Sequence, residues 1–314
     1  MKVVIKPGLT GNVITTVAIG NDYLKPWDQF ASKNWKKYCE KHSLGLIVFD
    51  SSLVDINNSH WKKPNWQKLL IGSELSKEGL NINNVCYLDT DILINPNSPN
   101  IFDNYYDTSS IGMISQIKNL PYPCPISDIN RRIAYLRNKY YSNKYPLDSL
   151  LFMPVEEIYK SHGLKSFTNY ACTGVFLFNV GIHSDLMSNW FYKYEKGIQT
   201  LTGGGEEPHF NFEVQSYGKI TWLDYRFQAL WNYEMAWKYP FLYQNGKDKS
   251  EINRKCIQAS LFTNYFLHFA GSWYESEMWE DDLIFNNSVY NEFDSFNEYS
   301  KIPVTGKPVG IKKP

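Results

Sequence analysis

The sequence has little of what marks disulfide-bonded, membrane-spanning or polyanion-binding proteins. Its five cysteines are scattered and include no C-x-x-C pair, so we expect neither a disulfide framework nor a zinc site, and a reducing compartment such as the cytoplasm. No apolar run approaches the ~18 residues of a transmembrane helix, and the N-terminal run is too short for a signal peptide. Lysine plus arginine and aspartate plus glutamate both number 32. Without a basic excess, a nucleic-acid partner is not expected.

The composition is typical of a soluble globular protein rich in aromatic residues. Hydrophobic residues make up 43% of the 314 residues and charged residues 20%, which is enough for a well-buried core. Aromatic residues make up 16%, with 10 tryptophans and 23 tyrosines. Most of these rings are expected in the core. A surface that handles sugars also needs them, because a flat ring stacks on the C–H face of a pyranose.

Strand and helix patterns alternate in the N-terminal third of the chain. Strands are predicted at residues 13–19, 44–49 and 85–88, and helices at residues 27–41 and 65–77. This order predicts right-handed βαβ units and a largely parallel sheet. Further strands are predicted at residues 175–180, 220–223 and 266–269, and further helices at residues 131–141 and 184–197, the last with Ser184 as its N-cap.

Two regions do not follow this pattern. The segment 115–168 is rich in proline, tyrosine and asparagine, and we expect an insertion that acts as a lid or binds an acceptor. From residue 289 the chain turns polar and ends in lysine and proline, so we expect a surface tail over 289–314. Residues 1–288 are then predicted to form a single domain.

The strongest local signal is the pair Asp89 and Asp91, which follows the apolar run 85–88. In a continuing strand, carboxylates at i and i+2 point to one face. At the carboxyl end of a parallel strand, that face opens on the crevice where ligands bind. Two hard oxygen ligands suit Mn²⁺ or Mg²⁺, which bridges to a diphosphate. Two solvated aspartates in a turn would give the same pattern, but the apolar residues on both sides favour the metal.

Two other motifs carry candidate site residues. His268 lies between apolar neighbours, and is either a hydrogen-bonded core residue or a third ligand that Mn²⁺ accepts. Gly271 would let the backbone approach a phosphate closely. Glu206 and Glu207 follow the glycine run 203–205. They are either favourable carboxylates at a helix N-terminus or a catalytic carboxylate beneath an anomeric carbon.

Lys68 and Tyr23 each have an ordinary and a functional interpretation. Lys68 stands early on the predicted helix 65–77 and is either a solvated lysine or a cation that neutralises a diphosphate. Tyr23 follows the first predicted strand and is either a half-buried tyrosine or a ring that stacks on a base.

Taken in order, these residues resemble the glycogenin and lipopolysaccharide galactosyltransferase family of retaining glycosyltransferases. The resemblance extends from about residue 13 to about residue 273, through the segments 18–23, 68–69, 87–93, 173–179, 206–211 and 268–271. It implies a GT-A (Rossmann-like) α/β fold with a mixed, mainly parallel sheet flanked by helices. It also implies a UDP-sugar as donor and a glycan, lipid or protein hydroxyl as acceptor.

The resemblance assigns roles to individual residues of this chain. Asp89, Asp91 and His268 are expected to hold Mn²⁺ (or Mg²⁺), and Glu206 and Glu207 to act at the anomeric carbon. The residues expected to contact the UDP-sugar are Ala18, Asn21, Tyr23, Lys68, Asp89, Thr90 and Gly271.

Two departures from the family keep other functions open. Cys172 replaces an asparagine, and the segment 274–276 replaces a Lys-Pro-Trp motif, so a catalytically weakened sugar-binding module of this fold is one alternative. A sugar nucleotidyltransferase is another, although it would open with a Gly-rich loop and a basic residue. A haloacid-dehalogenase-type phosphatase would place its Asp pair near the N-terminus.

Overall fold

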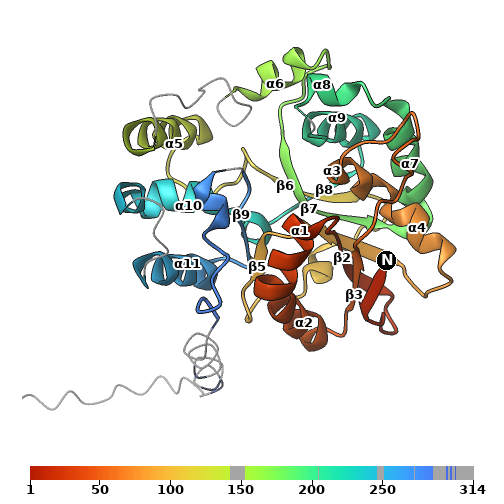
Figure 1. Cartoon of the computed structure of the whole chain (residues 1–314), viewed down its shortest axis with the longest axis horizontal. Helices are drawn as coiled ribbons and strands as arrows, with labels where there is room; N and C mark the ends of the chain where they lie inside the picture. The colour runs from red at the N-terminus through yellow and green to blue at the C-terminus, as the bar shows by residue number, and fades with distance from the viewer. Residues whose placement is uncertain are drawn as a thin grey trace, which may run out of the picture.

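The computed structural model describes residues 1–141, 153–203, 205–245, 251–271 and 273–285, together with residues 295, 298 and 301. Two sheets and the helices around them form an α/β fold (Figure 1). Part of the expected insertion, residues 142–152, lies outside the described residues. So does the predicted tail 289–314, apart from those three positions.

The central sheet has seven strands in the order β1-β3-β2-β4-β7-β6-β8. In sheet order they are β1 (Lys2–Ile5), β3 (Gly45–Phe49), β2 (Asn12–Val17), β4 (Asn84–Leu88), β7 (Ala171–Asn179), β6 (Ile111–Ser115) and β8 (Ile220–Leu223). The mixed sheet that we expected is therefore present. The β3–β2, β2–β4 and β6–β8 pairs are parallel, and the β1–β3, β4–β7 and β6–β7 pairs are antiparallel.

Alternate side chains of the central strands enter two separate cores. On β4, Val85 and Tyr87 belong to one core, whereas Cys86 and Leu88 belong to the other. This follows from the two-residue period of a strand. Both faces of the sheet are covered, which explains why its central strands read as continuous apolar runs.

The helices divide between these two faces (Figure 1). The core on the Val85 face includes side chains of α3 (Pro64–Gln67), α4 (Ile71–Lys77), α7 (Val180–Lys193) and α9 (Glu207–Tyr217). The core on the Cys86 face includes side chains of α2 (Ser32–Lys41), α5 (Ile126–Tyr140), α10 (Trp231–Lys238) and α11 (Glu251–Thr263). The described residues also include three short α-helices, α1 (Asn21–Pro26), α6 (Val155–Ser161) and α8 (Ile198–Leu201).

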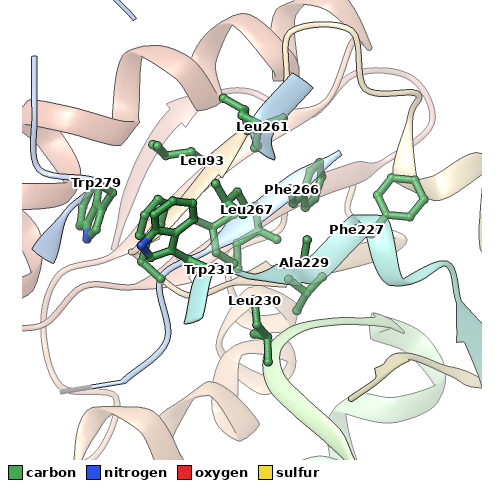
Figure 2. Packing of buried hydrophobic residues seen from close by; sticks show 14 of the residues in the cluster. Leu93, Phe227, Ala229, Leu230, Trp231, Leu261, Phe266, Leu267 and Trp279 are labelled. Carbon is green, nitrogen blue, oxygen red and sulfur yellow. The ribbon is translucent and has the colours of Figure 1, made fainter. Parts of the chain in front are cut away.

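A smaller sheet lies beside the Cys86 face and determines where the site forms. Its order is β5 (Ile92–Ile94), β10 (Phe266–His268) and β9 (Ala229–Leu230). Figure 2 shows its side chains, among them Leu93, Leu267 and Leu230, in one apolar cluster with Trp231. Burial of each such side chain contributes roughly 1.5–3 kcal/mol, so this sheet is firmly held against the main domain.

Several helix boundaries differ from prediction for local reasons. The first helical segment begins at Asn21, after Gly20 at φ 90°, and a π-helical turn, Trp27–Ala31, joins α1 to α2. Helix α7 begins at Val180 because the side chain of Asn179 accepts a hydrogen bond from the N–H of Ile182. Ser184, predicted as the N-cap, lies inside the helix, where its hydroxyl donates to the carbonyl of Val180.

Across the described ranges, no helix has both the length and the apolar character needed to cross a bilayer.

Candidate active site

The aspartate pair lies where the chain passes from one sheet to the other. Strand β4 ends at Leu88 and β5 begins at Ile92, in the smaller sheet. Our prediction reasoned from a strand that continues through the pair. The strand instead ends before it, because Ile92–Ile94 pairs with β10. The N–H of Asp89 donates to the carbonyl of Gly174 at 2.8 Å, and the carbonyl of Asp91 accepts from the N–H of Phe269 at 3.0 Å. These backbone bonds fix both aspartates at the junction.

Strand pairing brings His268 to the same junction. In the antiparallel β5–β10 ladder, His268 is the register partner of Ile92, the residue after Asp91. The imidazole Nε2 is 3.3 Å from Oδ1 of Asp91 and 3.7 Å from Oδ2 of Asp89. Ligand atoms of Asp89, Asp91 and His268 all lie within 4.8 Å of one another. Two half-buried carboxylates and a buried imidazole thus form a mixed oxygen and nitrogen donor set, which Mn²⁺ accepts.

The other ring nitrogen of His268, Nδ1, faces the side-chain amide of Gln228. With the Gln228 amide oriented to satisfy its neighbours, its oxygen accepts from Nδ1 of His268 at 3.2 Å. The same oxygen accepts from the backbone N–H groups of Gly174 and Val175. A proton held on Nδ1 leaves the Nε2 lone pair directed at the aspartates. Partners of this kind fix the tautomer of metal-binding histidines.

The charge around His268 also matches a cation site. Burial lowers the pKa of His268, but the Asp91 carboxylate raises it, and the pKa stands well above its ordinary value of 6.5. Asp91, together with Cys172, thus favours positive charge at this point. A bound divalent cation would take the place of that proton.

Gly174 leaves room for these groups. A Cβ at position 174 would lie 2.8 Å from Oδ2 of Asp89 and in still closer contact with Cε1 of His268. Any other residue here would push the imidazole and the carboxylate out of place. The bare backbone of β7 is thus part of the site, and the residues present fit a divalent cation.

Lys68 and Glu206 form a buried ion pair behind the aspartates. Nζ of Lys68 is 2.6 Å from Oε1 of Glu206 and 3.8 Å from Oδ1 of Asp89, and the two residues are 1% and 3% exposed. The Thr173 hydroxyl donates to Glu206 at 2.5 Å. Burial lowers the pKa of Lys68, but Asp89 and Glu206 raise it, and the net shift is upward. Lys68 is thus a charged, enclosed residue that orients Asp89, rather than a solvated helix lysine.

Glu207 has different surroundings from Glu206. It begins α9, is half-buried, and lines a cavity that Glu206 does not line. Burial and the neighbouring charge of Glu206 raise the pKa of Glu207 to about 7, from an ordinary value of 4.5. Lys68 and the backbone N–H of Thr173 oppose that rise. Of the two carboxylates proposed from the sequence, Glu207 is therefore the one placed to meet a ligand.

Two cavities adjoin near the metal-binding aspartates. The first cavity, of about 580 Å³, is lined by Asp89, Thr90, Asp91 and Tyr23, among others. The second cavity, of about 570 Å³, is lined by residues that include Glu207, Cys172, Asn232 and Tyr233. Gly203 and Gly271 line both cavities. Both volumes lie in the range of small-molecule sites.

The other predicted contact residues fall into two groups. Tyr23, 55% exposed on α1, and Thr90 line the first cavity, and Gly271, at φ 118°, lines both. Ala18 and Asn21 are not among the described residues that line either cavity. Ala18 is fully buried and its N–H donates to the carbonyl of Phe49, whereas Asn21 is exposed at the start of α1.

Some residues of the site were not found from the sequence. Gln228 and Asn232 belong to a largely apolar run with no motif. Arg137 lines the second cavity and pairs with Glu275, Nε to Oε1 2.8 Å, with both residues 2% exposed. These two residues are 138 positions apart, so no local pattern could have joined them.

Comparison with known proteins adds a distant likeness. No family model and no curated protein matches the sequence. Among solved structures, a glycosyltransferase involved in glycosylation of the major capsid of PBCV-1 has a TM-score of 0.44 and 11% identity, over 85% of this chain and 98% of that one. The bifunctional glycosyltransferase WbbM has a TM-score of 0.44 and 12% identity, over 93% of this chain and 52% of its own.

A third structure is the galactosyltransferase LgtC in complex with donor and acceptor sugar analogues. Its TM-score is 0.40 and its identity 11%, over 93% of this chain and 98% of that one.

Proposed function

We propose that the chain is a metal-dependent glycosyltransferase that moves a hexose from a UDP-sugar to an acceptor hydroxyl, with retention at the anomeric carbon. One observation carries the proposal. Asp89 and Asp91 of the metal-binding group line a cavity with room for a nucleotide, and that cavity adjoins, at Gly203 and Gly271, a second cavity lined by the separate carboxylate of Glu207. A diphosphate at that junction would present its sugar to Glu207.

The residues of the metal-binding group have distinct tasks. Asp89, Asp91 and His268 would hold Mn²⁺ or Mg²⁺, and Gln228 keeps the imidazole in the ligating tautomer. When bound, the metal stabilises negative charge on the leaving UDP. Tyr87 donates its hydroxyl to Oδ1 of Asp89 at 2.7 Å, and with Lys68 it holds that carboxylate in one orientation.

The two cavities fit the two halves of the donor. In the first cavity, the exposed ring of Tyr23 is available to stack on the uracil. At the shared boundary, the bare backbone of Gly271 allows a phosphate to approach closely. In the second cavity, the carboxylate of Glu207 would support an oxocarbenium-like transition state from the face opposite the leaving group.

The test is Mn²⁺-dependent release of UDP from a panel of UDP-hexoses. Asp91→Asn should lower the rate about 10²- to 10³-fold, the usual effect of removing one group that stabilises developing charge. Asp103→Asn, at an exposed position outside both cavities, is the matched control and should behave as wild type. An unchanged rate in Asp91→Asn would refute the metal assignment. UDP binding without any release would favour the sugar-binding module, and pyrophosphate exchange the nucleotidyltransferase.

A further inference from the structure

A third cavity opens beside the second, between α5 and the start of α6. Its volume is about 340 Å³. Half-buried apolar side chains form most of its wall: Ile117, Ile126, Ala134, Met153 and Val155. It belongs to the region expected from the sequence to be an insertion, and nothing in the proposed transfer reaction uses it.

The second and third cavities adjoin along a shared wall. Ile117, Asn130, Met153 and Val155 line both of them. At this boundary the Oδ1 atom of Asn130 is buried and has no partner among the described residues. A sugar hydroxyl supplies the donor that this oxygen lacks. The lining thus changes from mixed polar and apolar in the second cavity, which includes Glu207, to mainly apolar in the third.

Charge excludes several occupants of the third cavity. Arg131 is its only charged lining residue among those described, and it pairs with Asp128, Nη1 to Oδ1 3.0 Å. The wall therefore offers no carboxylate to a second metal-bound diphosphate, and few hydrogen-bonding groups to a second sugar. An apolar wall of this kind gains free energy mainly by removing apolar ligand surface from water.

We propose that the third cavity binds an apolar aglycone carried by the acceptor sugar. This inference rests on the proposed function and narrows it: the acceptor is a glycoside with an alkyl-like aglycone, whose sugar lies in the second cavity. Each methylene of the aglycone that is buried there improves binding about fourfold, equivalent to about 0.8 kcal/mol. Partial burial of a hexyl chain thus improves affinity at least roughly tenfold over a methyl group.

The experiment compares methyl and hexyl β-glucosides and β-galactosides by calorimetric titration of the full chain with Mn²⁺ and UDP present. The hexyl glycosides should bind at least about tenfold more tightly. Ala134→Trp fills the third cavity and should remove this preference while leaving methyl glycoside binding unchanged. Tyr135→Trp is the matched control. Tyr135 lies on the same helix, is 61% exposed and lines none of the three cavities, so the preference should persist.

Three results would overturn the inference. They are equal binding of methyl and hexyl glycosides, no binding of either, or a hexyl preference that survives Ala134→Trp. The last result would place the alkyl chain elsewhere on the molecule. UDP release from UDP-hexoses is measured in parallel. Its absence refutes the proposed function, whereas release without a hexyl preference refutes only the aglycone site.

Discussion

The backbone of Gly174 lies against the imidazole of His268 so closely that no side chain fits between them. Gly174 is on β7 of the central sheet and His268 on β10 of the smaller one. The same glycine accepts the N–H of Asp89 through its carbonyl. One residue without a side chain thus lets both sheets deliver ligands to one point.

Gly174→Ala should therefore weaken metal binding without unfolding the protein. The added methyl group displaces His268 or Asp89. Misplacing a ligand or its support typically costs 10- to 100-fold in metal affinity, so a loss in about that range is expected. Titration with Mn²⁺, followed calorimetrically, measures it, and circular dichroism checks the fold. Gly197→Ala is the control, because a Cβ there meets nothing within 4 Å. Equal Mn²⁺ affinity in both variants would show that Gly174 has no part in the site.

The Lys68–Glu206 pair predicts a large cost for removing either charge alone. Lys68→Met leaves Glu206 buried without its counter-charge, and loss of one partner of a buried pair costs about 3–5 kcal/mol in the free energy of unfolding. Lys68→Met combined with Glu206→Gln should recover most of that loss, because no lone charge remains. Urea unfolding measures both changes. Lys255→Met, which breaks the exposed pair with Glu251, should leave the unfolding midpoint unchanged. A double variant no more stable than Lys68→Met would argue against the pairing.

Local chemistry was readable from the sequence at the aspartate pair. Carboxylates at i and i+2 after an apolar run predicted Asp89 and Asp91 as one group, and the structure brings them together. His268 could be placed with them only through the family resemblance, because its approach depends on the β5–β10 register. Because β5 and β10 are far apart in the sequence, neither segment contains a pattern that predicts their pairing.

Lys68 shows a choice that pattern reasoning left open for a physical reason. A lysine on a predicted helix is usually solvated. Here, a 3₁₀ turn, Lys68–Leu70, separates α3 from α4, and its first residue is enclosed by the pairing with Glu206 and the carbonyl of Thr173. The partners come from β7 and from the residue before α9, so only the tertiary structure could show that this lysine is inside.

The pKa of Glu207, raised to about 7, predicts opposite pH effects on catalytic rate and on stability. If the carboxylate supports the transition state, kcat/KM should fall as pH drops through about 7, and Glu207→Gln should lose this limb of the pH profile along with most activity.

The contribution of Glu207 to the free energy of unfolding should change in the opposite direction with pH. Because the folded pKa exceeds the ordinary 4.5, the folded state holds the proton more tightly, and this contribution to stability is lost as pH rises from about 4.5 to about 7. Glu207→Gln, which is always neutral, should therefore gain in unfolding free energy relative to wild type across that window, as followed by urea unfolding. Parallel stability curves for the two proteins would mean that Glu207 titrates normally, and the acidic limb of the rate profile would then need another group.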